Sequence, residues 1–357
     1  ISNSDVTSTG TNIVLTAGID IIATDSNAET FITINAGQGI IDGSYVSNTS
    51  TITAIAAAAD IDGVSFNAAL TETITATAGS ISNSDVTSTG TNIVLTAGTN
   101  ITDTDASAET TLVGVAGTSI IEGSFISNTS TVTLTGTAGD IDGATVNSAL
   151  TATLTATDLI NADITVLGGA SNADLEATAG SISGVSVNSA NTIELDASID
   201  IIATDSNAEK AITINAGQGI IDGSYVSNTS TITAIAAAAD IDGVSFNAAL
   251  TETITATAGS ISNSDVTSTG TNIVLTAGID IIATDSNAET FITINAGQGI
   301  IDGSYVSNTS TITAIAAAAD IDGVSFNAAL TETITATAGS ISNSDVTSTG
   351  TNIVLTA

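Results

Sequence analysis

The chain has 357 residues, of which 37 are acidic and one is basic, so its formal net charge is −36. It contains no Cys, His, Met, Trp or Pro, which excludes disulfides, zinc and iron–sulfur sites, and thiol or Ser/His catalysis. Nucleic-acid binding is also excluded, because Lys210 alone cannot build a basic surface.

The hydropathy pattern predicts no membrane span in this sequence. The longest apolar run, Ala54 to Ala59, has six residues, whereas a spanning helix needs roughly 20. The sequence also begins without Met and without a signal-peptide pattern. We therefore expect it to be a segment of a longer protein.

Internal repeats dominate the sequence. Residues 21–80 recur as 201–260 with changes only at Thr30 and Phe31, and the copies are separated by more diverged stretches. Such periodicity is typical of solenoids and other repeat architectures. We predict one continuous β-solenoid over 1–357, with 80-residue repeats at 1–80, 81–159 (diverged), 201–260 (partial), 261–340 and 341–357 (partial), and irregular coils at 160–200.

A shorter period of about 20 residues lies within these repeats. An isoleucine begins each 20-residue piece, and pieces of 19, 22 and 19 residues in the middle predict a loop that bulges from one coil. We expect these isoleucines to stack as an inward ladder, with Ile160 and Ile182 as its irregular members. The other members are Ile1, Ile21, Ile41, Ile61, Ile81, Ile101, Ile121, Ile141, Ile201, Ile221, Ile241, Ile261, Ile281, Ile301, Ile321 and Ile341.

Each coil is predicted to contain two or three short strands. The first alternates apolar and polar residues, as at Ile13, Leu15 and Ala17, which places one face inward. The second centres on the ladder isoleucine, and the third on the sixth position of each piece: Val6, Val46, Phe66, Val86, Ile126 and Val146. The third position is mostly Gly or Asn, which tolerate a left-handed corner, as at Asn3, Gly43, Gly63, Gly123 and Gly323.

These patterns predict an all-β fold, a parallel β-helix of about 18 coils of about 20 residues stacked about 4.8 Å apart. Right-handed winding follows from the usual chirality of parallel crossovers. A helix is the alternative for the alanine-rich segment 51–60. We reject it because the run is short and its Thr and Ile residues prefer strands.

Residues 20 apart become neighbours in such a stack, so carboxylates are expected to form columns. Three carboxylates in close contact repel one another unless a proton or a hard cation such as Ca²⁺ lies between them. A solvated acidic face is the simpler alternative. The predicted calcium ligands are Asp42, Asp60 and Asp62, and their copies Glu122, Asp140, Asp142, Asp222, Asp240, Asp242, Asp302, Asp320 and Asp322. A second column pairs Asp5 with Asp25, Asp85 with Asp105 and Asp265 with Asp285.

Three other functions were weighed against simpler readings. Paired carboxylates can cleave polysaccharides, but the chain lacks the basic and aromatic residues that hold such substrates. The pairs Thr9/Thr11 and Thr49/Thr51 are similar to ice-binding arrays, but other residues interrupt them, so we expect ordinary strand threonines. Asn48 and its copies at Asn128, Asn228 and Asn308 match the N-glycosylation pattern and are expected at the surface.

The segments Ser80–Asn83 and Ile93–Gly98, with joins such as Ala17–Ile19, resemble the coils of filamentous-haemagglutinin-type bacterial surface proteins. The resemblance implies a secreted or surface-displayed fibre or adhesin stalk. From the residues alone we expect a structural, non-enzymatic spacer at the cell surface that self-associates into fibres or bundles. The alternative is a protein that binds cations, minerals or glycans along its acidic columns, with calcium as the only cofactor considered.

Overall fold

The computed structural model describes residues 1–357 and contains no helix. The chain divides into two compact units, Ile1–Ala179 and Gly180–Ala357. Each unit is a parallel β-solenoid, and together they contain about 18 coils. This confirms the predicted all-β parallel solenoid. The alanine-rich segment that could have formed a helix contains strand β7 (Ile52–Ala56).

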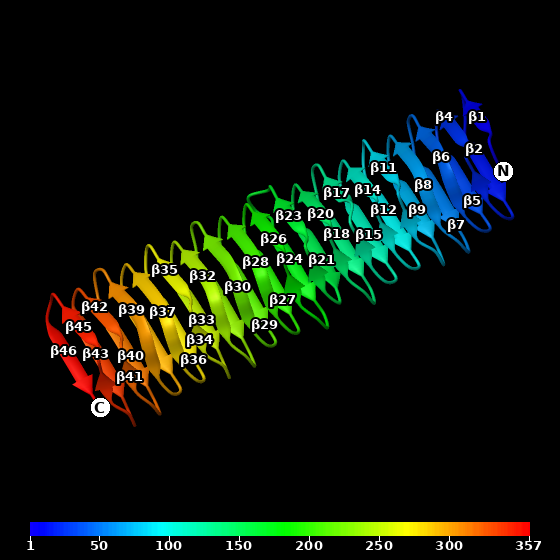
Figure 1. The fold of residues 1–357 in the computed structure, drawn as a ribbon. Coiled ribbons are helices and arrows are strands. Elements are labelled where there is room, and N and C mark those ends of the chain that lie inside the picture. Colours follow the sequence, from blue (N-terminus) through cyan, green and yellow to red (C-terminus); the bar gives the residue numbers. More distant parts are fainter. The chain divides into compact units, whose positions relative to one another are not determined.

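Each unit contains two parallel sheets, which we call sheet A and sheet B in both units. A coil contributes one strand to sheet B, and either two short strands or one longer strand to sheet A. Within each unit, the strands of successive coils lie side by side in sequence order (Figure 1). Hydrogen bonds of the parallel ladders therefore join every coil to the next one in the same unit.

The strands of the first unit have the following bounds. Sheet A contains β1 (Asp5–Ser8), β3 (Ile21–Ile22), β4 (Asp25–Ala28), β6 (Ile40–Ser47), β8 (Ile61–Ala68), β10 (Ile81–Ser82), β11 (Asp85–Ser88), β13 (Ile101–Thr102), β14 (Asp105–Ala108), β16 (Ile120–Ile121), β17 (Ser124–Ser127), β19 (Ile141–Asp142), β20 (Thr145–Ser148), β22 (Leu159–Ile160) and β23 (Asp163–Val166). Sheet B contains β2 (Ile13–Ala17), β5 (Ile32–Ala36), β7 (Ile52–Ala56), β9 (Glu72–Ala76), β12 (Ile93–Ala97), β15 (Leu112–Ala116), β18 (Val132–Gly136), β21 (Ala152–Ala156) and β24 (Ala173–Ala177).

The second unit follows the same plan. Sheet A contains β25 (Ile182–Ser183), β26 (Ser186–Ser189), β28 (Ile201–Ala208), β30 (Ile220–Ser227), β32 (Ile241–Ala248), β34 (Ile261–Ser262), β35 (Asp265–Ser268), β37 (Ile281–Ala288), β39 (Ile300–Ser307), β41 (Ile321–Asp322), β42 (Ser325–Ala328), β44 (Ile341–Ser342) and β45 (Asp345–Ser348). Sheet B contains β27 (Ile193–Ala197), β29 (Ile212–Ala216), β31 (Ile232–Ala236), β33 (Glu252–Ala256), β36 (Ile273–Ala277), β38 (Ile292–Ala296), β40 (Ile312–Ala316), β43 (Thr331–Ala336) and β46 (Asn352–Thr356).

The core lies between the two sheets and follows the predicted alternation in sheet B. In β5, Ile32, Ile34 and Ala36 are buried, whereas the residues between them are partly exposed. Period-two alternation places these three side chains on the inner face. Burial of each isoleucine contributes about 1.5–3 kcal/mol.

The predicted isoleucine ladder is correct at most positions but wrong by one residue at five. Ile21 pairs with Ile40, and Ile40 pairs with Ile61, so Ile40 is the inward residue and Ile41 lies outside. The spacing there is 19 and then 21 residues, because the turn before β6 is one residue shorter than the turn before β8. The buried residues Ile40, Ile120, Leu159, Ile220 and Ile300 replace the predicted Ile41, Ile121, Ile160, Ile221 and Ile301.

The same slip alters two predicted residues of the third strand. Tyr45 and Phe125 point inward in place of Val46 and Ile126, whereas Phe66, Val86 and Val146 are buried as predicted. The buried rings of Tyr45 and Phe66 stack on adjacent coils, with their centroids 5.5 Å apart. The second unit repeats this contact between Tyr225 and Phe246 and between Tyr305 and Phe326.

The predicted left-handed corners occur at the expected place in most coils. Asn3, Gly63 and Gly323 have φ angles of 48°, 65° and 70°. Where the turn is shorter, Asp42 and Glu122 carry this conformation, and the predicted glycines after them, Gly43 and Gly123, also have positive φ. Three alanines occupy the same corner, although a Cβ atom disfavours it: Ala23, Ala203 and Ala283, at 45° to 47°.

The irregular middle of the sequence contains an outward loop in the first unit. Residues 167–172 connect β23 to β24 and are longer than the corresponding turns of other coils. Leu167 in this loop is 69% exposed. No helical segment with the length and apolarity needed to cross a membrane occurs in the structure.

Candidate functional site

The predicted calcium ligands lie at the corner of each coil that leads into sheet A. Asp60 precedes β8, and its Oδ1 accepts a hydrogen bond of 2.7 Å from the Ser80 amide. Asp62 lies in β8, and its Oδ1 accepts bonds from Ser82 Oγ at 2.7 Å and Asn83 Nδ2 at 2.8 Å. Neutral donors of the next coil thus hold both carboxylates.

The copies of these two aspartates have equivalent partners. Asp240 and Asp320 accept from backbone amides at 2.7 Å, and Asp140 accepts from the Asp158 amide at 3.2 Å. The hydrogen bonds from Ser342 and Asn343 lower the pKa of Asp322 below its ordinary value. The remaining copies, Asp142 and Asp242, accept from asparagine side chains, and Asp242 accepts from a serine hydroxyl as well.

The expected stacking of Asp42 on Asp62 is wrong. The register pairs Ile41 with Asp62, which places Asp42 over Gly63. A Cβ atom at Gly63 would lie 2.7 Å from Asp42 Oδ1, so the corner leaves room for this aspartate only because Gly63 lacks a side chain. The copies Glu122, Asp222 and Asp302 likewise lie against Gly143, Gly243 and Gly323. Their stacking is shifted for the same reason as the ladder: the 19-residue spacing of these coils.

None of the predicted trios gathers in the structure, and no group of three or more acidic side chains is placed to hold a metal ion. Pairs of carboxylates do occur. Asp5 pairs with Asp25, Asp85 with Asp105 and Asp265 with Asp285, as the second predicted column requires.

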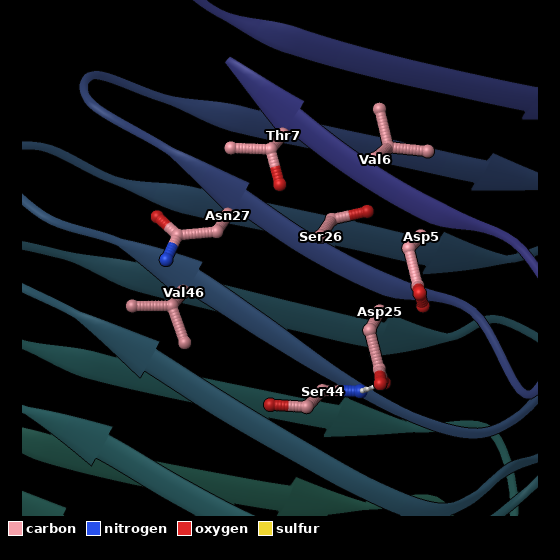
Figure 2. Close-up of a pocket in the computed structure, with 8 residues that line it drawn as sticks. All are labelled: Asp5, Val6, Thr7, Asp25, Ser26, Asn27, Ser44 and Val46. Atoms are coloured by element: carbon pink, nitrogen blue, oxygen red, sulfur yellow. Dashed lines mark hydrogen bonds between the residues drawn. The ribbon is translucent and has the colours of Figure 1, made fainter. Parts of the chain in front are cut away.

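These aspartate pairs border shallow depressions on the outer side of sheet A. Figure 2 shows one of them, where Asp5 and Asp25 lie one above the other and the Ser44 amide donates to Asp25 Oδ1 at 2.9 Å. Thr7, Asn27 and Val46 complete its rim. Similar depressions recur in the second unit, beside Asp265 and Asp285 and beside Asp205.

A carboxylate pair that the sequence analysis missed joins Glu122 to Asp103. A hydrogen bond between the two side chains raises the pKa of Glu122, and the nearby charge of Asp142 adds to this effect. The 19-residue spacing brings Glu122 over Asp103. Only a register with unequal turns could have revealed this pair.

A second missed feature is a fully buried glutamate in the core. Glu72 takes the ladder position between Ile52 and Ile93 in sheet B and has no exposed surface. Neither of its carboxyl oxygens has a hydrogen-bond partner of normal geometry. Burial raises its pKa to about 9, an increase that the nearby Ala68 amide partly offsets.

The glutamate recurs at Glu252 and Glu332 in the second unit. Burial likewise raises the pKa of Glu252 to about 9. The Ala328 amide donates a hydrogen bond of 2.8 Å to Glu332 Oε1. The sequence signal was present: in the segments around these residues, Glu occupies the apolar phase of the strand alternation.

Other residues singled out from the sequence lie at turns. Asn48 is exposed after β6, as expected, and its Nδ2 donates to Asn27 Oδ1 at 2.8 Å. Thr9, Thr11 and Thr49 also lie in turns, so the interpretation as ordinary strand threonines is wrong.

No protein-family model, curated protein or solved structure matches this chain.

Proposed function

We propose that this chain is a structural segment of an extracellular filament or adhesin stalk, in which it acts as a stiff, anionic spacer. The observation that carries the proposal is the in-register pairing of successive coils in both units. Sheet B of each unit pairs strand to strand along its stack, as from β2 through β5, β7 and β9 in the first unit.

This architecture suits a spacer because its bonds run along the stacking direction. Hydrogen bonds of two sheets and a buried ladder of aliphatic side chains resist bending between coils. Each coil contacts chiefly its neighbours, so copies can be added or lost without repacking a distant core. The near-identical repeats 1–80 and 261–340 fit this expectation.

The surface chemistry supports exposure outside a cell. A net charge of −36 keeps separate chains soluble and apart at low salt. The chain has no Cys or Met, the side chains most easily oxidised. Its single trypsin site, Lys210, lies in the turn between β28 and β29. The coil-level resemblance to filamentous-haemagglutinin-type surface proteins points to the same role.

A length series tests the spacer function. Variants that carry one or two additional copies of residues 1–80 should lengthen by a constant increment of about 19 Å per copy, because four coils are added at about 4.8 Å each. The measurement is particle length by electron microscopy. Particles that become wider rather than longer, or that bend freely, would contradict the proposal.

The location has its own test. Antibodies against the chain, applied to intact cells that produce it, should label the outer surface or filaments extending from it in immunogold microscopy. Labelling that appears only after the cells are opened would contradict a surface role and would leave the stiffness result unaffected.

A second candidate function is weak binding of divalent cations along the aspartate pairs. The direct stacking of Asp5 on Asp25, and of its copies, favours it, because adjacent carboxylates attract hard cations. Bridging by such cations would also permit the self-association of filaments. The calcium experiment in the Discussion tests this candidate.

A further inference from the structure

The outer face of sheet B has a composition unlike the rest of the molecule. The second residue of each strand points outward and forms a first rank along the stack, in which every member is threonine or valine. In the first unit, from β2 to β21, this first rank is Val14, Thr33, Thr53, Thr73, Val94, Val113, Thr133 and Thr153.

The fourth residue of each strand forms a second rank beside the first. In the same unit it consists of Thr16, Asn35, Ile55, Thr75, Thr96, Val115, Thr135 and Thr155. The second unit repeats both ranks, with the first rank at Thr213, Thr233, Thr253, Val274, Thr293, Thr313, Thr333 and Val354.

Neither rank contains a charged residue over these strands, although the chain has 37 acidic residues. The uncharged run of the first unit ends at β24, where Asp174 and Glu176 face outward. In the second unit the corresponding acidic strand is β27, with Glu194 and Asp196. The acidic side chains are thus concentrated at the corners, on sheet A and on these two strands, and the Thr/Val face is left neutral.

The face is also regular and stiff. In-register parallel strands repeat each rank at about 4.8 Å, and the two ranks are about 6.7 Å apart along the strand. Thr and Val have the same shape, and their β-branched side chains keep restricted χ1 rotamers. In Figure 1, strands β2, β5, β7 and β9 keep nearly the same direction from coil to coil.

A two-dimensional lattice of hydroxyl and methyl groups with these repeats is close to the spacing of water molecules on faces of hexagonal ice. The methyl groups disfavour liquid-like water against the face, while the threonine hydroxyls can bond to ordered water. We propose that the outer face of sheet B, in each unit, is an ice-binding surface.

Electrostatics selects ice over the other occupants of such a face. A second copy would bring a further charge of −36 toward the first. A cationic partner would be drawn to the acidic corners rather than to the Thr/Val face. Ice is neutral, flat and periodic, and it requires no charge on its partner. The proposal is independent of the spacer function.

The experiment measures thermal hysteresis and ice-crystal shape with the full chain. The test variant combines Thr73→Lys and Thr253→Lys, one first-rank substitution in each unit. The matched control combines Thr87→Lys and Thr267→Lys, which place the same charges on half-exposed outward positions of sheet A. The wild-type chain and the control should shape ice and show hysteresis, and the first-rank variant should lose both.

Circular dichroism melts show whether the variants fold. If the first-rank lysines lower the melting temperature of the chain, Thr73→Asn with Thr253→Asn replaces them, because asparagine already occurs on this face at Asn35 and Asn295. The same loss of hysteresis is expected for the asparagine variant.

Three outcomes would overturn the proposal. The first is no hysteresis and no ice shaping by the wild-type chain, and the second is equal loss in the first-rank variant and the sheet A control. The third is a dimer in sedimentation velocity that the first-rank lysines dissociate, which would assign the face to a second copy.

Discussion

At the residue scale, single side chains in special environments decide local stability. The left-handed corner is filled by Gly or Asn in many coils, and by alanine at Ala23, Ala203 and Ala283. The buried ladder of sheet B accepts a carboxylic acid at Glu72 and Glu252. Both kinds of residue depart from the consensus of their position, and both have measurable energetic consequences.

Replacing the corner alanines of the second unit should stabilise the chain. Ala203→Gly and Ala283→Gly remove a Cβ atom from residues whose φ is 47°, and each should gain about 1 kcal/mol because the left-handed conformation disfavours a side chain. Urea denaturation measures the gain. The control is Ala57→Gly, at an exposed bend without positive φ. Equal effects at all three positions would show that the corner is not strained.

The buried glutamates should make stability depend on pH. The folded-state pKa of Glu72 and Glu252 is about 9, against an ordinary value of 4.5. Between these values the unfolded chain releases a proton that the folded chain retains. Stability is therefore greatest below pH 4.5 and falls as pH rises toward 9, by up to about 1.4 kcal/mol per pH unit for each glutamate.

Glu72→Gln combined with Glu252→Gln should flatten this dependence and raise the melting temperature at pH 8. Glu29→Gln provides the control, because Glu29 is exposed. Melting temperatures measured from pH 5 to pH 9 compare the variants. A profile for the double variant that is parallel to that of the wild-type chain would show that these glutamates are not the groups that titrate.

At the element scale, the lengths of the turns set the register of the strands. Alternation within each strand is local, but which residue of a pair such as Ile120 and Ile121 points inward depends on the number of residues in the preceding turn. A one-residue change moves a side chain from the core to the surface. The same slip moves Glu122 over Asp103 and Asp42 over Gly63.

A pair of substitutions in β16 distinguishes the observed register from a uniform 20-residue period. Ile120→Ala should cost about 2–5 kcal/mol because it creates a cavity in the core. Ile121→Ala should cost about 0.5 kcal/mol or less, as is usual for surface positions. Chemical denaturation measures both free energies. A larger loss for Ile121→Ala would restore the uniform ladder.

At the scale of the whole molecule, charge repulsion opposes the compact state. With 37 acidic residues and one lysine, little internal compensation is available. Screening by salt shortens the range of this repulsion from about 30 Å at 0.01 M ionic strength to about 8 Å at 0.15 M. Stability and association should both respond to ionic strength.

Melting temperature should rise between these two ionic strengths in sodium chloride. Calcium at matched ionic strength should raise it further if the aspartate pairs bind cations, and magnesium should do so less, because it gives up its water ligands reluctantly. Differential scanning calorimetry makes the comparison. Equal melting temperatures in the sodium and calcium solutions would contradict the cation-binding candidate and leave the spacer proposal standing.

The sequence by itself determined the solenoid, its inward alternation and the approximate position of its corners. Period-two patterns such as Ile32, Ile34 and Ala36 and the repetition of coils are local signals that survive any register. They also sufficed to exclude a helix at residues 52–56 and to place Asn48 at the surface.

Only the tertiary structure decided which residues stack on one another. Glu122 meets Asp103, the predicted carboxylate trios separate, and the outward threonines of sheet B align into uncharged ranks. The physical reason is that hydrogen bonding between strands and filling of the core select the register of each coil, and turns of unequal length absorb the difference. A constant count along the sequence cannot represent that compensation.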